Sequence, residues 1–261
     1  MQVLLKSERK ILEDKSEMIL QEKKAIIFDK DGTLLQFVPF WVPVAKSAVR
    51  QMIKPYMSDD KTAANILLAA ENTLGIKNDM LQRDGILSAG SYEQAAVAIN
   101  EILNRFGIES NITREETETA FEDNLAEGKI IPTCKNLREK LERLKRSGKF
   151  LFLVTTDSSQ ITSRCLNVLG ILDLFDSIYC DDGIHLTKPS PYAVEAIMRL
   201  YRLQYGDICM VGDTTTDIKF AKNAQIESVC VGNNKKASEM ADYTFDDVGV
   251  FLDCLLLNER G

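Results

Sequence analysis

Two carboxylates, Asp29 and Asp31, follow a short apolar run at Ala25–Phe28, and Gly32 stands directly after them. Side chains two residues apart in an extended segment point the same way, and a glycine lets the backbone approach a ligand closely. One carboxylate could act as a nucleophile or metal ligand, and the other as its acid–base partner. A strand-to-loop turn rich in Asp and Gly is the alternative interpretation of the same residues.

Hydroxyl groups follow a second apolar run. Thr155 and Thr156 come directly after Phe150–Val154, where the pattern predicts that a helix begins. Hydroxyls and free main-chain amides at the start of a helix can bind an anion. Capping of the helix explains the hydroxyls of this segment equally well, because Thr, Asp and Ser are all good capping residues. The segment is therefore a candidate phosphate site.

A lysine and two further carboxylates complete the set. Lys188 precedes a helix that is expected to start at a proline, although a lone lysine is usually a solvated surface residue. Asp213 directly follows the apolar run Ile208–Val211, and Asp217 lies one helical turn later on the same face. These residues are candidate ligands of a metal or a phosphate.

The elements that must position these residues are short strands with helices between them. Four apolar runs show no in/out alternation and are too short for helices: Ala25–Phe28, Phe150–Val154, Ile208–Val211 and Ser228–Val231. Continuous apolar strands are typical of a parallel sheet that is covered on both faces. Helical spacing between the runs, as in Leu137, Leu141 and Leu144 before Gly148, completes the pattern of a doubly wound α/β domain.

One edge of the predicted sheet would hold the chemically active side chains, because the carboxyl ends of strands in open α/β sheets meet where ligands bind. Asp29, Asp31, Asp213 and Asp217 would crowd together there, and such a group does not stay fully ionised without a cation. Carboxylate oxygens in small number suggest Mg²⁺, which also shares oxygens of a bound phosphate. The nearby lysine and threonine hydroxyl would then bind the phosphoryl oxygens.

The stretch 42–130 interrupts the alternation of strands and helices. It has apolar residues at helical spacing and no convincing strand. We predict an all-helical module at 42–130, inserted into a core made of residues 23–41 and 131–261. Residues 1–22 form an N-terminal extension, for which a packed helix and a frayed tail are equally plausible.

The composition favours carboxylate chemistry. The chain has 261 residues with 32 Lys and Arg against 39 Asp and Glu, a net charge of −7, and a single histidine. An acidic chain argues against a nucleic-acid partner or an anionic membrane, and one histidine excludes a His-rich metal centre. Six cysteines without a CxxC pair, an N-terminus without a signal-peptide core and no long apolar run predict a cytoplasmic protein. The sequence leaves the oligomeric state open.

Taken in order, the four motifs resemble the signature of the haloacid dehalogenase superfamily. The chain has Asp29-Lys30-Asp31-Gly32-Thr33, then the strand-end Thr155, then Lys188, then Gly212-Asp213 with Asp217, and the match spans about residues 24–231. The resemblance is to phosphoglycolate-phosphatase-like members with a helical cap. It implies a Rossmann-like core with the cap inserted between the first and second motifs, where 42–130 lies.

The resemblance also implies roles for individual residues. Asp29 would be the nucleophile that forms an aspartyl-phosphate, and Asp31 the general acid that later serves as base. The implied phosphate-binding residues are Thr155, Thr156 and Lys188. The implied Mg²⁺ ligands are Asp29, Asp31 through its main-chain carbonyl, Asp213 and, as a supporting acid, Asp217.

The reaction that fits best is hydrolysis of a small phosphorylated metabolite. Dehalogenases and phosphonatases of this superfamily lack the second Asp of the first motif, which is present here as Asp31. Sugar phosphomutases resemble a pattern with a cap histidine, whereas the only histidine, His185, lies outside the predicted cap and is expected to be a solvated loop residue. We therefore predict a Mg²⁺-dependent phosphatase. A sugar phosphomutase and a non-catalytic binding protein are the alternatives.

Two segments near the predicted cap could select the substrate. Gln36 stands where many such phosphatases have Asp. The aromatic run at 37–41 could line a pocket or pack the cap hinge. The segment 83–90 carries Arg83 and two glycines, and is equally well read as a substrate-facing loop or as plain surface. The substrate cannot be identified from either segment.

Overall fold

The computed structural model describes residues 18–257 apart from 58, 78–79, 83 and 84. The prediction for residues 1–17 therefore lies outside the described residues. Leu20 is fully buried, and Gln21 Nε2 donates a hydrogen bond to the main-chain oxygen of Cys254 at 2.9 Å. The chain divides into two compact units, one from residues up to Gln36 and from Pro132 onward, the other Phe37–Ile131.

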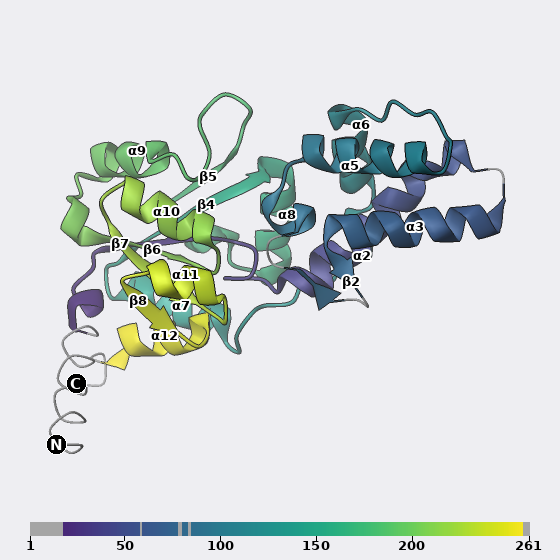
Figure 1. The fold of residues 1–261 in the computed structure, drawn as a ribbon. Coiled ribbons are helices and arrows are strands. Elements are labelled where there is room, and N and C mark those ends of the chain that lie inside the picture. The colour runs from purple at the N-terminus through teal and green to yellow at the C-terminus, as the bar shows by residue number, and fades with distance from the viewer. Residues whose placement is uncertain (1–17, 58, 78–79, 83–84, 258–261) are drawn as a thin grey trace, which may run out of the picture. The chain divides into compact units, whose positions relative to one another are not determined.

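The first unit is built on a six-stranded sheet in which every pair of neighbouring strands is parallel. Its strands are β1 (Ala25–Phe28), β4 (Phe150–Ser158), β5 (Ser177–Asp181), β6 (Ile208–Gly212), β7 (Glu227–Val231) and β8 (Tyr243–Phe245). Their order across the sheet is β5-β4-β1-β6-β7-β8 (Figure 1). The predicted α/β fold with a parallel sheet is confirmed. The four predicted strands are the four inner ones, and the two edge strands were not predicted.

Helices cover both faces of this sheet. They are α7 (Leu137–Arg146), α8 (Ser159–Leu169), α9 (Tyr192–Tyr201), α10 (Thr215–Asn223), α11 (Lys235–Met240) and α12 (Val248–Leu255). Alternate residues of β1 serve the two faces, as strand geometry requires. Ile26 and Phe28 pack in one core with α7, α8 and α12, whereas Ala25 and Ile27 pack in another with α9 and α10.

The chain leaves this unit and returns to it at neighbouring points. Leu35 and Pro132 form an isolated antiparallel bridge, and the Thr133 N–H donates to the Leu34 oxygen at 3.0 Å. Gln36 Nε2 also donates to the Pro132 oxygen at 3.2 Å. The two crossings are therefore tied together inside the first unit.

The second unit is mainly helical. It contains α2 (Phe37–Ile53), α3 (Asp60–Leu74), α4 (Ile86–Ala89), α5 (Tyr92–Arg105), α6 (Arg114–Asp123) and a minimal antiparallel pair of strands, β2 (Ile76–Lys77) and β3 (Met80–Leu81). The prediction of an all-helical module was wrong at this pair. The end of α3 at Gly75, with φ at 95°, turns the chain back. Strands of two residues are too short to show an alternating pattern.

The second unit also begins earlier than the predicted boundary at residue 42. Its first helix already starts at Phe37, because Phe40 and Trp41 are buried within the unit and their rings meet edge to face at 5.0 Å. Trp41 also lies 6.3 Å from the Phe121 ring of α6. Of the two interpretations of the aromatic run, packing is the one that the structure supports.

Two further sequence expectations concern the described residues. Four of the cysteines are buried and two are half-buried, and all six are free thiols. None of the helices in the described ranges combines the length and the apolar character needed to cross a membrane.

Candidate active site

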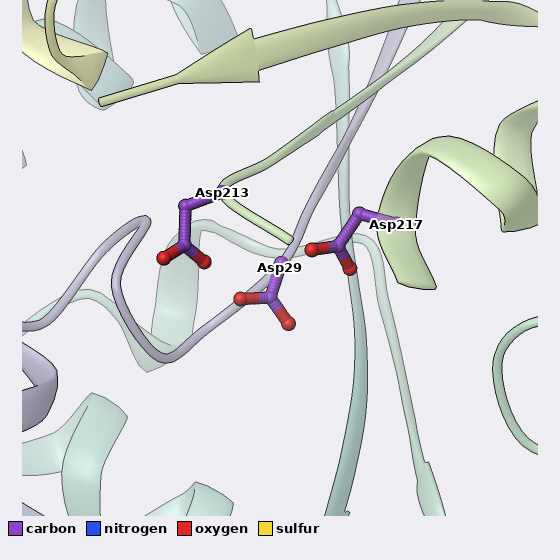
Figure 2. Close-up of side chains that lie close together, drawn as sticks. All are labelled: Asp29, Asp213 and Asp217. Carbon is purple, nitrogen blue, oxygen red and sulfur yellow. The ribbon is translucent and has the colours of Figure 1, made fainter. Parts of the chain in front are cut away.

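Three carboxylates gather at the carboxyl edge of the sheet. Asp29 follows β1, Asp213 follows the adjacent strand β6, and Asp217 lies in the first turn of α10 (Figure 2). One oxygen of each carboxylate lies within 4.8 Å of the others. The structure thus brings together three of the four predicted metal ligands. The carboxylate of the fourth, Asp31, does not belong to this group.

Lys188 forms ion pairs with two of these carboxylates. Its Nζ lies 2.5 Å from Asp29 Oδ1 and 2.6 Å from Asp217 Oδ1, and its side chain is 3 % exposed. Burial alone would lower the pKa of Lys188, but Asp217 and Asp29 raise it above its ordinary value, so the lysine stays charged. Burial also raises the pKa of Asp29 to about 6, against the opposing effect of Lys188.

The start of α10 fixes the orientation of Asp217. Thr214 is the N-cap residue, and its hydroxyl accepts a hydrogen bond from the Asp217 N–H at 3.4 Å. In return, Asp217 Oδ2 accepts from the Thr214 N–H at 3.0 Å and from the Thr214 hydroxyl at 2.6 Å. This capping box holds one carboxylate oxygen and leaves the other, Oδ1, on Lys188.

Two glycines allow the carboxylates to approach the backbone. Gly32 has φ at +83°, and a Cβ at this residue would lie 2.3 Å from Asp213 Oδ2. A Cβ at Gly212 would lie 2.3 Å from the carboxyl carbon of Asp217. Both distances are impossible for a real Cβ, so the acidic cluster in this form requires glycine at both positions.

The second motif lies on the extended end of β4. Thr155 is buried, and its hydroxyl accepts a hydrogen bond from the Asp157 N–H at 3.2 Å, whereas Thr156 is exposed. The helix cap is neither threonine but Ser158, which accepts from the Ile161 N–H at 3.4 Å. Capping thus does not account for the two threonines.

A pocket of about 450 Å³ opens beside the second motif. Both Thr155 and Lys188 line it, together with Tyr179, Tyr192 and Phe220. Its walls come from the first unit alone. Thr156 is not among the lining residues, so the two predicted phosphate-binding threonines differ in their surroundings.

A second buried ion group, which the sequence analysis missed, surrounds Lys30. This lysine is fully buried, and its Nζ lies 2.6 Å from Asp31 Oδ2 and 2.7 Å from Asp157 Oδ2. Burial raises the pKa of Asp31 to about 8; Lys30 opposes this rise and Asp157 adds to it. The sequence did contain a signal for this group. Lys30 follows a fully apolar strand, and strand alternation places it on the same face as Ile26 and Phe28, which point toward the core.

His185 is an exposed loop residue, as predicted. Its side chain is 48 % exposed, its Nδ1 lies 2.7 Å from Asp182 Oδ2, and its ring stacks on Tyr192 with centroids 4.5 Å apart. The candidate selectivity residue Arg83 lies outside the described residues. The rest of its segment includes the short helix α4, which belongs to the second unit.

Comparison with known proteins agrees with this geometry. The family described as haloacid dehalogenase-like hydrolase matches residues 23–225. A phosphoglycolate phosphatase of Vibrio vulnificus (strain CMCP6) is 29 % identical over 248 residues, which cover 92 % of this chain and all of the relative.

Solved structures share the fold. A protein of Haemophilus somnus 129PT described as a predicted phosphoglycolate phosphatase has a TM-score of 0.66 at 22 % identity, with 89 % of this chain and 97 % of that chain covered. The HAD-hydrolase YfnB of Bacillus subtilis, solved bound to magnesium, has a TM-score of 0.61 at 17 % identity, with 90 % and 99 % covered. At these identities the likeness concerns the fold alone.

Proposed function

The chain belongs to the haloacid dehalogenase-like hydrolase family and is an enzyme of its phosphatase type, and from that premise we propose how it works. We propose that it is a Mg²⁺-dependent phosphatase that hydrolyses a small phosphate monoester through an aspartyl-phosphate on Asp29. The observation that carries the proposal is the position of Lys188 between Asp29 and Asp217, two members of the cluster that also contains Asp213. A buried cation beside a buried carboxylate suits a nucleophile that must approach an anionic phosphate.

The donor set fits Mg²⁺. Oxygen ligands in small number suit this ion, and the crowding of Gly32 against Asp213 forms a cradle that only glycine permits. The magnesium bound to YfnB, which shares the fold, supports the assignment. Asp29, Asp213 and the Asp31 main-chain carbonyl would hold the ion, with Asp217 as a supporting acid. When bound, Mg²⁺ supplies positive charge to the transferring phosphoryl oxygens.

The residues then divide the reaction between them. An Asp29 oxygen attacks phosphorus, the bond from phosphorus to the leaving oxygen breaks, and the Asp31 carboxyl gives that oxygen a proton. Asp31 next takes a proton from water, whose oxygen attacks the phosphoryl group and releases phosphate from Asp29. Lys188 and the hydroxyls of Thr155 and Thr156 bind the phosphoryl oxygens. A pKa of about 8 leaves Asp31 protonated at neutral pH, as the first step requires.

The relatives suggest the substrate class. Several curated relatives are phosphoglycolate phosphatases, the one from V. vulnificus matching over its whole length. The pocket of about 450 Å³ is lined by the predicted phosphate-binding residues Thr155 and Lys188, while Asp29 and Asp213 are not among its lining residues. We therefore propose 2-phosphoglycolate as the first substrate to test.

The test is release of phosphate by the purified chain from 2-phosphoglycolate in Mg²⁺, with EDTA as the metal-free control. We expect Mg²⁺-dependent turnover, and a loss of about 10⁴-fold or more in Asp29→Asn, because a covalent nucleophile has no substitute. Asp253→Asn is the matched control, since Asp253 is an exposed carboxylate paired with Lys140. Acid-quenched protein should contain a phosphorylated peptide that includes Asp29.

Two results would contradict the proposal. Wild-type turnover in Asp29→Asn would show that Asp29 is not the nucleophile. A sugar phosphate that isomerises faster than phosphate appears would identify a phosphomutase instead.

A further inference from the structure

Lys30 is buried at a place where a lysine is unfavourable. It is fully buried and follows a strand whose residues Ile26 and Phe28 pack in an apolar core. Moving a lysine out of water is costly, and an apolar side chain would fill such a position without that cost. The described contacts of its Nζ atom therefore point to what this lysine does.

The Nζ atom of Lys30 bridges two carboxylates from different strands. Asp31 Oδ2 lies 2.6 Å away in the turn after β1, and Asp157 Oδ2 lies 2.7 Å away near the end of β4. The Lys30 cation lies between the two carboxyl groups, so it attracts either one when it is ionised and offsets their mutual repulsion when both are. Lys30 thus joins the turn after β1 to the end of β4 through their side chains.

The Asp31 carboxyl has one oxygen engaged and one available. Oδ2 contacts Lys30, while Oδ1 is buried and has no hydrogen-bond partner among the described residues. Main-chain hydrogen bonds fix the conformation of this turn. The Leu34 N–H donates to the Lys30 oxygen at 2.9 Å, and the Gly32 N–H donates to the Leu35 oxygen at 2.7 Å. The side chain of Asp31 is held by its contacts with Lys30 and with Asp157, which Lys30 also binds.

We propose that Lys30, itself held by Asp157, is a positioning residue that keeps the Asp31 carboxyl directed at the leaving oxygen of the substrate. The inference rests on the proposed function, in which Asp31 protonates that oxygen and later activates water. Proton transfer requires heavy atoms within about 2.6–3.2 Å, and a misplacement of about 1 Å can reduce the rate by about 10²-fold. In this proposal Lys30 affects the reaction through Asp31 and not by binding the substrate.

The leaving group separates this role from a purely structural one. An alkoxide, as from 2-phosphoglycolate, must be protonated as it departs, whereas p-nitrophenolate departs without a proton. Displacing the Asp31 carboxyl therefore slows the first step for the alkyl ester and spares it for the aryl ester. The second step needs Asp31 as base with both esters, so the aspartyl-phosphate should accumulate with the aryl ester.

The experiment measures first-turnover rates for both esters in saturating Mg²⁺. In Lys30→Met we expect the rate with 2-phosphoglycolate to fall by about 10²-fold or more, and the rate with p-nitrophenyl phosphate to fall by less than about tenfold. The aryl ester should also give a burst of p-nitrophenolate followed by slow turnover. Asp157→Asn removes the outer anchor and should give the same pattern with a smaller ratio.

Lys23→Met is the matched control. Lys23 is also a buried lysine beside β1, but it lies at the opposite end of the strand and pairs with Glu227 at 2.7 Å. Its replacement should lower the melting temperature and leave the ratio of the two first-turnover rates unchanged. Circular dichroism of each variant checks folding, and Asp157→Asn decides the matter if Lys30→Met does not fold.

If the folded variants lose the same factor in first-turnover rate with both esters and show no burst, Lys30 is not a positioning residue. Turnover by the wild-type chain would still support the proposed function in that case. Absence of turnover of either ester by the wild-type chain would overturn the proposed function and this inference with it.

Discussion

Two buried lysines at the carboxyl edge of the sheet have nearly the same surroundings and, in our interpretation, different tasks. Each Nζ lies between two carboxylates at 2.5–2.7 Å; the groups are Lys188 with Asp29 and Asp217, and Lys30 with Asp31 and Asp157. The first group shares Asp29 and Asp217 with the acidic cluster that also contains Asp213, whereas the second group shares no residue with that cluster. A buried ion pair therefore does not reveal its task by its geometry alone.

The two groups differ more clearly in the pKa values of their carboxyl groups than in the surroundings of their lysines. The pKa of Asp29 is raised to about 6, so a nucleophile at this position is ionised at neutral pH. The pKa of Asp31 is raised to about 8, so a proton donor keeps its proton. Two carboxyls whose surroundings separate their pKa values are the usual arrangement for a base or nucleophile beside an acid.

The largest expected effect distinguishes the two lysines by substrate. Lys188→Met should reduce first turnover by about 10³-fold or more with both 2-phosphoglycolate and p-nitrophenyl phosphate, because the charge on the phosphoryl group is the same for either leaving group. Rapid-quench measurement of both esters checks this. A selective loss with the alkyl ester, as expected for Lys30→Met, would mean that the two groups do not differ in the way proposed.

An intermediate effect is expected at Gly32, which is close to Lys30 in sequence but contacts Asp213 of the other region. A Cβ would lie 2.3 Å from Asp213 Oδ2, so Gly32→Ala should raise the Mg²⁺ concentration for half-maximal activity by about 10–100-fold with both esters. Gly148→Ala is the control, because Gly148 has a similar φ of +86° with no atom within 4 Å of its Cβ position. An unchanged Mg²⁺ requirement in Gly32→Ala would contradict the assignment of Asp213.

The smallest effect concerns stability and its dependence on pH. Both carboxyls have native pKa values above the ordinary 3.8, so the folded protein binds these protons more tightly than the unfolded chain. Their stabilising contribution is complete below about pH 4 and is lost as the pH rises, through about 6 for Asp29 and about 8 for Asp31.

In metal-free protein at pH 8, Asp31→Asn should therefore raise the free energy of unfolding, by about 1–3 kcal/mol. Asp29→Asn should raise it less, and both gains should vanish near pH 4. Urea unfolding at the two pH values measures this. A larger gain for Asp29→Asn would reverse the order of the two pKa values.

The sequence predicts the centre of the sheet better than its edges. The four inner strands are buried on both faces and appear as continuous apolar runs. The outer strands β5 and β8 have one neighbour each and are only partly buried, with the sequences SIYCD and YTF. An edge strand needs no continuous apolar run, so its sequence resembles a loop.

The candidate site divides in a similar way. Asp29, Asp213 and Asp217 follow or cap elements that are recognisable from the sequence, so their meeting at one edge could be predicted. The contact of Lys30 with Asp157 could not, because it depends on which face each residue takes beyond Phe28 and Leu153, the last pair of the β1–β4 ladder. No spacing rule covers two residues that lie past the last pair of a ladder.

The bridge between Leu35 and Pro132 has a consequence for how such a protein can change. The chain leaves the sheet unit and returns to it at paired residues. The whole segment Phe37–Ile131 is therefore inserted at one point of that unit, as a long loop between two paired residues would be. Lengthening, shortening or exchanging that segment leaves every strand connection of the sheet intact. The sheet unit with its acidic cluster and the helical unit can thus change independently within one chain.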